Sequence, residues 1–135
     1  MRKYLFTILL VLAFSASAYG AEKLLAVTEV LKKVDSAKHT SAEIKEYYKS
    51  IKGKEAEGRG KVIDVLKGRR DRHRVTILTA AGKPKKGYDV VLYTEMNAPA
   101  QLKKGQTIKF KGEIGRISSF RGTSVDIHGG YEKVK

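Results

Sequence analysis

The densest group of side chains that could bind an anion lies in the stretch KGRRDRHRV, residues 67–75. Its five basic residues are Lys67, Arg69, Arg70, Arg72 and Arg74. Guanidinium groups bind phosphate and carboxylate groups through two parallel hydrogen bonds, and they stay charged at any physiological pH. These residue types therefore indicate recognition of an anionic ligand.

A second basic stretch, residues 116–121, contains Arg116, Phe120 and Arg121. An exposed aromatic ring such as Phe120 offers a face on which a nucleobase can stack, a contact worth about 1–3 kcal/mol per base. Tyr88 and Tyr93 are two further candidates for stacking. The alternative interpretation is that both basic stretches are solvated loops and that Phe120 packs against the protein.

The charge of the whole chain agrees with an acidic partner. Its 135 residues include 28 Lys and Arg but only 14 Asp and Glu, which gives a formal net charge of +14 at pH 7. Such a field favours nucleic acid or another acidic polymer as the partner. Scattered lysines would serve solubility alone, whereas arginines concentrated in one stretch indicate binding.

Other kinds of chemistry have little support in the sequence. The chain has no cysteine, so it has neither a disulfide nor a thiol nucleophile. Its three histidines, His39, His73 and His128, are far apart, and no carboxylate has a partner at metal-ligand spacing. Asp64, Asp71 and Asp89 could be considered for a nuclease site only on their nearness to arginines. We expect no metal, no cofactor and no enzymatic activity.

The N-terminus has the features of a secretory signal peptide. Arg2 and Lys3 precede an apolar run over residues 4–14 and the small-residue run SASA at 15–18. The apolar run is too short to cross a bilayer, which takes about 20 residues. We expect cleavage after Ala18 or Gly20 and release into the periplasm of a bacterium or the medium, with the formal charge lowered from +14 to +12. The alternative is an uncleaved anchor.

Two helices are predicted next, in a segment over residues 21–52. Apolar residues recur at helical spacing between residues 22 and 34. The sequence Thr40-Ser41-Ala42-Glu43 has the form of a capping box, which predicts a second helix that ends before Gly53.

Beyond Gly53 the pattern becomes that of strands, in a domain over residues 53–129 followed by a frayed basic tail at 130–135. Strands are predicted at 55–66, 72–79, 88–94, 106–114 and 123–128, with a short helix at 97–102 and with a coiled strand or a bulge near Gly58 and Gly60. Alternation along the strands predicts a core of Val62, Val65, Val75, Ile77, Val90, Leu92, Ile108, Phe110, Ile114, Val125 and Ile127.

Five short strands with a helix between the third and the fourth describe an OB-fold, a small closed barrel, here mostly β with N-terminal helices. On the stretches LKKGQTIKFKGEI (102–114) and GKEAEGRGKVIDV (53–65), the chain resembles the exported OB-fold proteins of the tRNA-anticodon-binding-domain-like family. The resemblance covers residues 47–129 and implies a fold and, by analogy, nucleic-acid binding.

The OB-fold ligand cleft lies over the second and third strands, between the first-to-second and fourth-to-fifth loops. This mapping predicts a basic wall at Lys67, Arg69, Arg70, Arg72 and Arg74, and a facing wall at Arg116, Phe120 and Arg121. The second interpretation is a structural module that holds a protein partner of the bacterial envelope. A third and weaker one is haem handling, because HGGY (128–131) loosely resembles the His-and-Tyr element of periplasmic haem chaperones.

The signal peptide gives the first testable prediction. The chain recovered from the envelope or medium of an expressing bacterium should lack its first 18–20 residues, and its intact mass measures this directly. Full-length chain in the membrane fraction would contradict the prediction.

Overall fold

The computed structural model describes residues 24–67, 72–80, 84–94, 102–119 and 121–134. Its elements in chain order are β1 (Leu25–Ala26), α2 (Val27–Lys33), α3 (Ser41–Ile51), β2 (Glu55–Lys67), β3 (His73–Leu78), β4 (Val90–Thr94), β5 (Thr107–Ser118) and β6 (Ser124–Lys133). No helix within these ranges is long and apolar enough to span a membrane.

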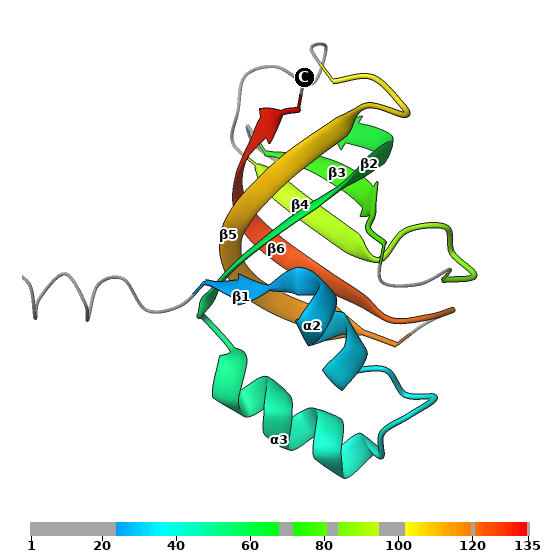
Figure 1. Ribbon diagram of the computed structural model, residues 1–135, viewed down its shortest axis with the longest axis vertical. Helices are drawn as coiled ribbons and strands as arrows, with labels where there is room; N and C mark the ends of the chain where they lie inside the picture. Colours follow the sequence, from blue (N-terminus) through cyan, green and yellow to red (C-terminus); the bar gives the residue numbers. More distant parts are fainter. Residues whose placement is uncertain (1–23, 68–71, 81–83, 95–101, 120, 135) are drawn as a thin grey trace, which may run out of the picture.

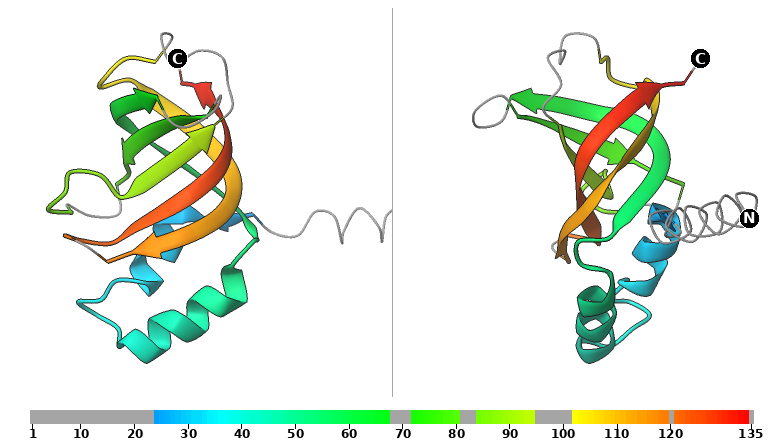
Figure 2. Two further views of the ribbon diagram at one scale, coloured as in Figure 1. Left: turned by 180° about the vertical axis from the view of Figure 1, so that it is seen from behind. Right: turned by 90° about the vertical axis from the view of Figure 1, so that its left-hand side faces the viewer.

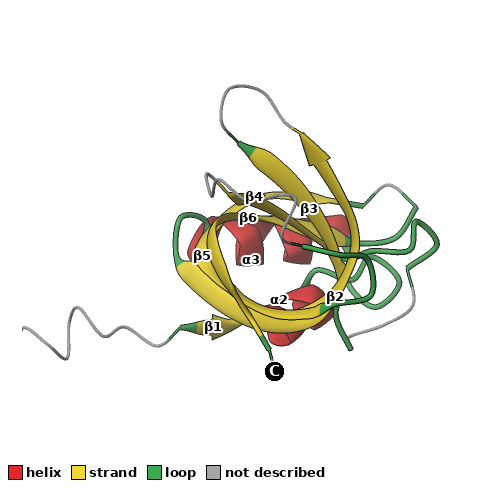
Figure 3. Cartoon of the chain, turned by 90° about the horizontal axis from the view of Figure 1, so that it is seen from above, coloured by secondary structure: helices red, strands yellow, loops and turns green. Residues whose placement is uncertain are grey.

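Five of the described strands close into a barrel (Figures 1 and 3). The neighbours follow the order β2-β3-β4-β6-β5, and β5 pairs back with β2. Strands β4 and β6 are parallel, while the other four pairings of the barrel are antiparallel. This closed five-stranded order is that of an OB-fold, so the predicted fold class is confirmed.

The barrel is filled by the inward side chains of all five strands. Every predicted core residue is buried except Val65, which is partly buried and packs against the cluster. Phe110 is the largest of the fully buried side chains. A Cβ atom on Gly58 would lie 2.7 Å from its ring, so the glycine makes room for Phe110.

The two helices cover one end of the barrel, as two further views also show (Figure 2). Helix α2 buries Val27, Val30 and Leu31 in the core cluster. The predicted helix over 22–34 is wrong at its start, because Leu25 and Ala26 pair in parallel with Ala56 and Glu57 of β2. Strand β3 begins to pair with β2 only at Lys61, so this edge of β2 is open to β1.

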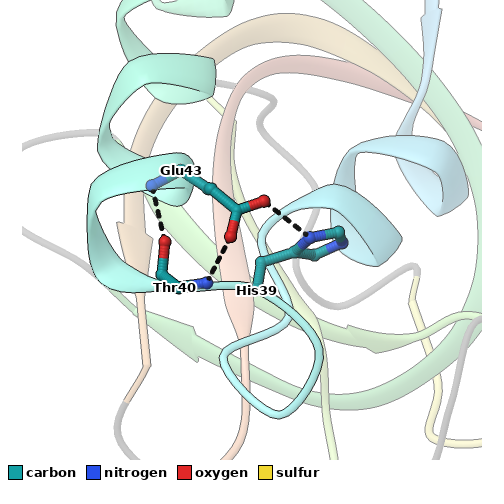
Figure 4. A network of polar contacts seen from close by, with 3 residues as sticks. All are labelled: His39, Thr40 and Glu43. Carbon is teal, nitrogen blue, oxygen red and sulfur yellow. Dashed lines mark hydrogen bonds and ion pairs between the residues drawn. The ribbon is translucent and has the colours of Figure 1, made fainter.

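Helix α3 begins at the predicted capping box (Figure 4). The Thr40 hydroxyl accepts a hydrogen bond from the Glu43 amide (3.2 Å), and the Glu43 carboxylate accepts one from the Thr40 amide (3.1 Å). These hydrogen bonds, with His39 beside the carboxylate at 3.6 Å, lower the pKa of Glu43. The Tyr48 hydroxyl ties the helix to the barrel by donating to the Gly115 carbonyl (2.9 Å).

Two strands run further than their sequence pattern predicts. Strand β5 continues to Ser118 past a register shift between Ile114 and Ile117, and β6 continues to Lys133, so the predicted frayed tail is wrong. The two strands cross closely where Gly112 pairs with Gly129, and a Cβ atom on Gly112 would strike the His128 carbonyl. Gly129, which follows the end of the predicted last strand, is therefore required within the ladder.

Of the two alternatives predicted at Gly58 and Gly60, a coiled strand or a bulge, the bulge lies elsewhere in β2. Pairing of β2 with β5 is regular from Glu55 to Lys61, and the register of β2 shifts against β3 between Val62 and Asp64. Both glycines instead relieve crowding inside the barrel. The predicted helix at 97–102 falls outside the described residues except for Leu102, which is buried.

Phe110 tests the barrel core. Its replacement by Ala removes the largest buried side chain and leaves a cavity, which should cost about 3–5 kcal/mol of unfolding free energy. Denaturant unfolding of the protein without residues 1–20 measures this. Phe110→Leu, which keeps most of the volume, is the matched control and should cost much less. Equal stability of Phe110→Ala and the parent would show that β5 does not fill the core.

Candidate ligand-binding face

Four side chains form a continuous row on the outside of the barrel. The register pairs Leu66 with Arg74, Arg74 with Tyr93, and Tyr93 with His128, across β2, β3, β4 and β6. Their chain neighbours on β3, β4 and β6 (Val75, Leu92 and Ile127) are buried in the core. Because side chains alternate between the faces of a strand, the four must point outward. We call them the platform row.

The platform row combines an apolar surface with aromatic rings and a cation. The Tyr93 and His128 rings are stacked, with centroids 5.0 Å apart and planes 14° apart. Leu66 is 44% exposed, and among the described residues it is the one large hydrophobic residue that is exposed. Burial raises the pKa of Tyr93, and nearby Asp126 raises it further, against the opposite effect of Arg74 and Arg116. The row offers flat faces next to positive charge.

Further cations surround this row. The Lys86 ammonium donates to the Ser124 hydroxyl (2.7 Å) and lies 5.4 Å from the centre of the Tyr88 ring. Burial raises the pKa of Asp126, while His128, Arg116, Arg74 and Lys86 act in the opposite direction. A carboxylate that interacts with all four of these groups shows that they gather on one side of the barrel.

The outward face of β2, β5 and β6 on the other side has a different charge pattern. Directly opposed pairs there include Glu57 with Lys111 and Lys109 with Glu132. The outward positions carry four cations and four carboxylates: Arg59, Lys61, Lys109 and Lys111, and Glu55, Glu57, Glu113 and Glu132. Because the charges balance, this face is a solvated mixed surface rather than an anion-binding one.

Two hollows in the described part of the surface do not coincide with the platform row. One, of about 900 Å³, lies on the charge-balanced face beside Arg59, Lys109 and Tyr131. The other, of about 500 Å³, lies between the α2–α3 connection and the segments that contain Lys85 and Arg121. Leu66 and His128 of the platform row are exposed, whereas Arg74 and Tyr93 are partly buried.

The predicted site residues lie at the two ends of the outer surface that β3, β4 and β6 form. Lys67 ends β2 and pairs with His73, and Arg72 is exposed just before β3. At the other end Arg121 is exposed, and its carbonyl accepts from the Lys86 amide (3.2 Å). The structure therefore separates the two predicted walls by the length of β3 and β4. Arg69, Arg70 and Phe120 lie outside the described residues.

Three other predicted positions belong to the face itself. Arg74 and Tyr93 are members of the platform row, and Tyr88 lies beside Lys86. Arg116 was predicted in a loop, which is wrong, because it lies in β5 at the register shift.

Four residues of this surface were not predicted: Leu66, Lys86, Asp126, and His128 as a stacking partner. Strand alternation carries the signal for Leu66, Asp126 and His128, since each lies next to an inward-facing residue. For Leu66 this signal could not be used without the register, because the bulge near Asp64 changes which side chains of β2 point outward.

Asp89 has a structural role. It is buried, and its carboxylate accepts hydrogen bonds from the Thr79 amide (2.9 Å) and hydroxyl (2.6 Å). Asp64 accepts from the Val65 amide (2.9 Å), and Asp71 lies outside the described residues. Within the described ranges no group of three His, Cys, Asp or Glu residues could hold a metal ion.

Comparison with known proteins gives structural likeness only. No family model matches the chain, so its resemblance to the tRNA-anticodon-binding-domain-like family stays a prediction. No curated protein matches it either.

Several solved structures resemble the chain at low identity. One is a Replication Protein A heterotrimer bound to single-stranded DNA (11% identity, 62% of this chain, TM-score 0.42), and this chain spans 58% of the length of that one. A second is a small single-stranded DNA-binding protein from Streptomyces coelicolor (16%, 61% of this chain, 94% of that chain, TM-score 0.44). A third is an OBody bound to hen egg-white lysozyme (16%, 63% of this chain, 83% of that chain, TM-score 0.45).

Asp89 gives a prediction about stability and pH. Burial raises its pKa in the folded protein, against the effect of the Thr79 hydrogen bonds. The folded state is therefore favoured when Asp89 is protonated, and this contribution is lost as the pH rises through the raised pKa. Asp89→Asn keeps an acceptor for the Thr79 amide without the charge, so its stability relative to the parent should increase between about pH 3 and about pH 7.

Asp89→Ala is the matched comparison. It removes both hydrogen bonds with Thr79 and should cost about 1–3 kcal/mol at about pH 3, and this cost should fall toward about pH 7 because Ala, like Asn, does not titrate. Denaturant unfolding at several pH values measures both variants. The account of Asp89 is wrong if Asp89→Asn destabilises the protein as much as Asp89→Ala.

Proposed function

We propose that this protein binds single-stranded nucleic acid on the outer face of β3, β4 and β6. The single observation that carries this proposal is the platform row, in which the stacked Tyr93 and His128 rings adjoin the Arg74 guanidinium. Single strands are bound where cations follow the phosphates and rings stack on the bases. The platform row supplies both kinds of contact within one surface.

The apolar and aromatic part of the face favours single strands over other polyanions. A duplex hides its base faces inside the stack, and an acidic glycan offers charge without planar rings. A duplex therefore could not stack its bases on the Tyr93–His128 pair, and a glycan has no base to stack there. Single strands present bases that can unstack and lie on these groups.

The basic stretches at the two ends of the face extend this proposal. Lys67, Arg69, Arg70 and Arg72 would contact phosphates at the end where β2 passes into β3. Arg116 and Arg121 would contact phosphates toward the other end, with Phe120 as a further stacking residue. The strand would then run along β3 and β4 from one basic stretch to the other.

We further propose that the protein acts outside the cytoplasm. Residues 1–20 carry the features of a cleaved signal peptide. The ligand would then be nucleic acid in the periplasm or the medium, and the protein would act by binding and not by catalysis.

The dependence of affinity on salt tests the role of the arginines. For single strands, log affinity falls against log salt with a slope of about −0.7 per phosphate neutralised. Arg74→Ala and Arg116→Ala should each weaken binding of a fluorescent oligo(dT) and make this slope less steep by about 0.7. Lys109→Ala removes the same charge from the balanced face and should leave both quantities nearly unchanged. Equal effects of all three variants would indicate a diffuse field instead of a site.

The aromatic contact is tested separately. Tyr93→Ala should weaken oligo(dT) binding by about 1–3 kcal/mol while the salt slope stays the same, because stacking releases no counterions. Fluorescence anisotropy with oligo(dT), duplex DNA and an acidic oligosaccharide gives the ranking of ligands. Preference for the oligosaccharide, or binding to none of the three, would contradict the proposed function.

A further inference from the structure

The His128 ring has a defined place on the proposed binding face, next to a glycine of β5. The ladder pairs His128 with Glu113, but the imidazole reaches Gly115, two residues further along β5. A Cβ atom on Gly115 would lie 2.7 Å from Nε2 and 2.9 Å from Cδ2 of His128, closer than packed atoms can approach. The imidazole therefore occupies the space that a side chain at this position would take.

The backbone itself does not require a glycine at position 115. Gly115 is not among the described residues with a positive φ, so alanine can adopt its conformation. The three atoms nearest to the added Cβ all belong to side chains, two of them to His128 and the third being Asp126 Cβ at 3.5 Å. At Gly112, in contrast, the Cβ atom would strike a backbone carbonyl. What Gly115 provides is therefore room for one movable ring.

The other neighbour of the His128 ring is Tyr93 of β4. The two rings are stacked, with centroids 5.0 Å apart and planes 14° apart. The imidazole is thus confined between the Tyr93 ring on one strand and the Gly115 backbone on the next. His128 is exposed, so a side chain at position 115 would push its ring toward solvent with little loss of buried surface. The stack with Tyr93 would be lost while the barrel stays intact.

Helix α3 fixes the same segment of β5. The register of β5 against β6 shifts between Ile114 and Ile117, so Gly115 and Arg116 lie outside the regular pairing. The Tyr48 hydroxyl donates a hydrogen bond to the Gly115 carbonyl (2.9 Å). A segment without ladder pairing is thereby held by the helix at the residue that contacts the imidazole.

We propose that Gly115 is a positioning residue of the binding face, because its missing side chain admits the His128 ring to the stack with Tyr93, and that Tyr48 holds Gly115 in place. The inference rests on the proposed function and adds the residues that shape the same site. Neither residue has to touch the nucleic acid. A base that stacks on rings already ordered loses less of its binding energy to ordering them. Helix α3 thereby contributes to binding from outside the face.

Replacement of Gly115 by Ala tests the positioning role. Gly115→Ala should unfold at nearly the same denaturant concentration as the parent, yet bind oligo(dT) about five- to tenfold more weakly, because the bases lose part of an ordered stack. The salt slope should not change, since no charge is removed. Gly130→Ala is the matched control, because Gly130 also lacks a positive φ and a Cβ atom there has no neighbour within 4 Å. It should bind like the parent.

The His128→Ala background separates positioning from a general effect on structure. Without the imidazole, the space beside Gly115 is free. Gly115→Ala should then weaken oligo(dT) binding no further, because the ring that it displaces is absent. A loss of affinity that is equally large with and without His128 would overturn the inference.

Nuclear magnetic resonance of the ligand-free protein measures the ring position directly. The carbon-bound protons of the His128 imidazole lie beside the Tyr93 ring and their shifts respond to it, so Tyr93→Leu gives the shifts of an unstacked imidazole. At the same pH, Gly115→Ala should move the shifts toward these values, and Tyr48→Phe should move them in the same direction by less. Tyr47→Phe is the matched control, because the Tyr47 hydroxyl makes no hydrogen bond within the described residues.

The outcomes separate this inference from the proposed function. Unchanged His128 shifts in Gly115→Ala, or an oligo(dT) affinity equal to that of the parent, would overturn the inference and leave the proposed function intact. A parent protein that does not bind oligo(dT) would overturn the proposed function, whereas the shifts of the ligand-free protein would still decide whether Gly115 positions the ring. If Gly115→Ala does not fold, Tyr48→Phe decides, and shifts and affinity equal to those of Tyr47→Phe would overturn the inference.

Discussion

Strand β2 has to pair with two neighbours, and the rest of the structure depends on this constraint. Its first half pairs with β5, and its second half pairs with β3. A strand can serve both only if it coils strongly, and the coil closes the barrel around Phe110. Gly58 and Gly60 permit the coil because their missing side chains leave room for the Phe110 and Ile77 side chains.

Closure of the barrel determines which side chains can meet on its surface. Once the register is set, Leu66, Arg74, Tyr93 and His128 come from four different strands to one row. The charged residues that remain divide unequally between the two sides, because β2 and β5 carry charges of both signs outward, whereas Arg74, Arg116 and Lys86 gather around Asp126. The chemistry of the proposed binding face is thus a consequence of register more than of any local motif.

Local sequence signals predict the elements of this fold well where the residues that give the signal also stabilise the element. The capping box at Thr40 and Glu43 starts α3, and alternation in β5 identifies Ile108, Phe110 and Ile114 as core. The signals fail where pairing with a segment distant in the sequence determines the local structure. Leu25 and Ala26 look helical but pair with an open strand edge, and the Gly129–Gly130 pair looks like a strand end but continues β6.

The residues of the candidate site are likewise only partly predictable from the sequence. Clustered arginines indicate an anionic ligand, and the OB-fold topology places them near the second and third barrel strands, so Arg74 and Tyr93 are found from sequence. The stacking of His128 on Tyr93 is not, because the parallel pairing of β4 with β6 joins residues 35 positions apart. A register shift in β2 likewise decides that Leu66 faces outward.

A nuclear magnetic resonance titration with oligo(dT) tests the central claim most directly, because each backbone amide reports on its own part of the surface. The account predicts that the largest shift changes fall on the amides of Leu66, Arg74, Tyr93 and His128, while those of Arg59, Lys109 and Lys111 change little. Changes concentrated on the second group, or spread evenly over both faces, would contradict it.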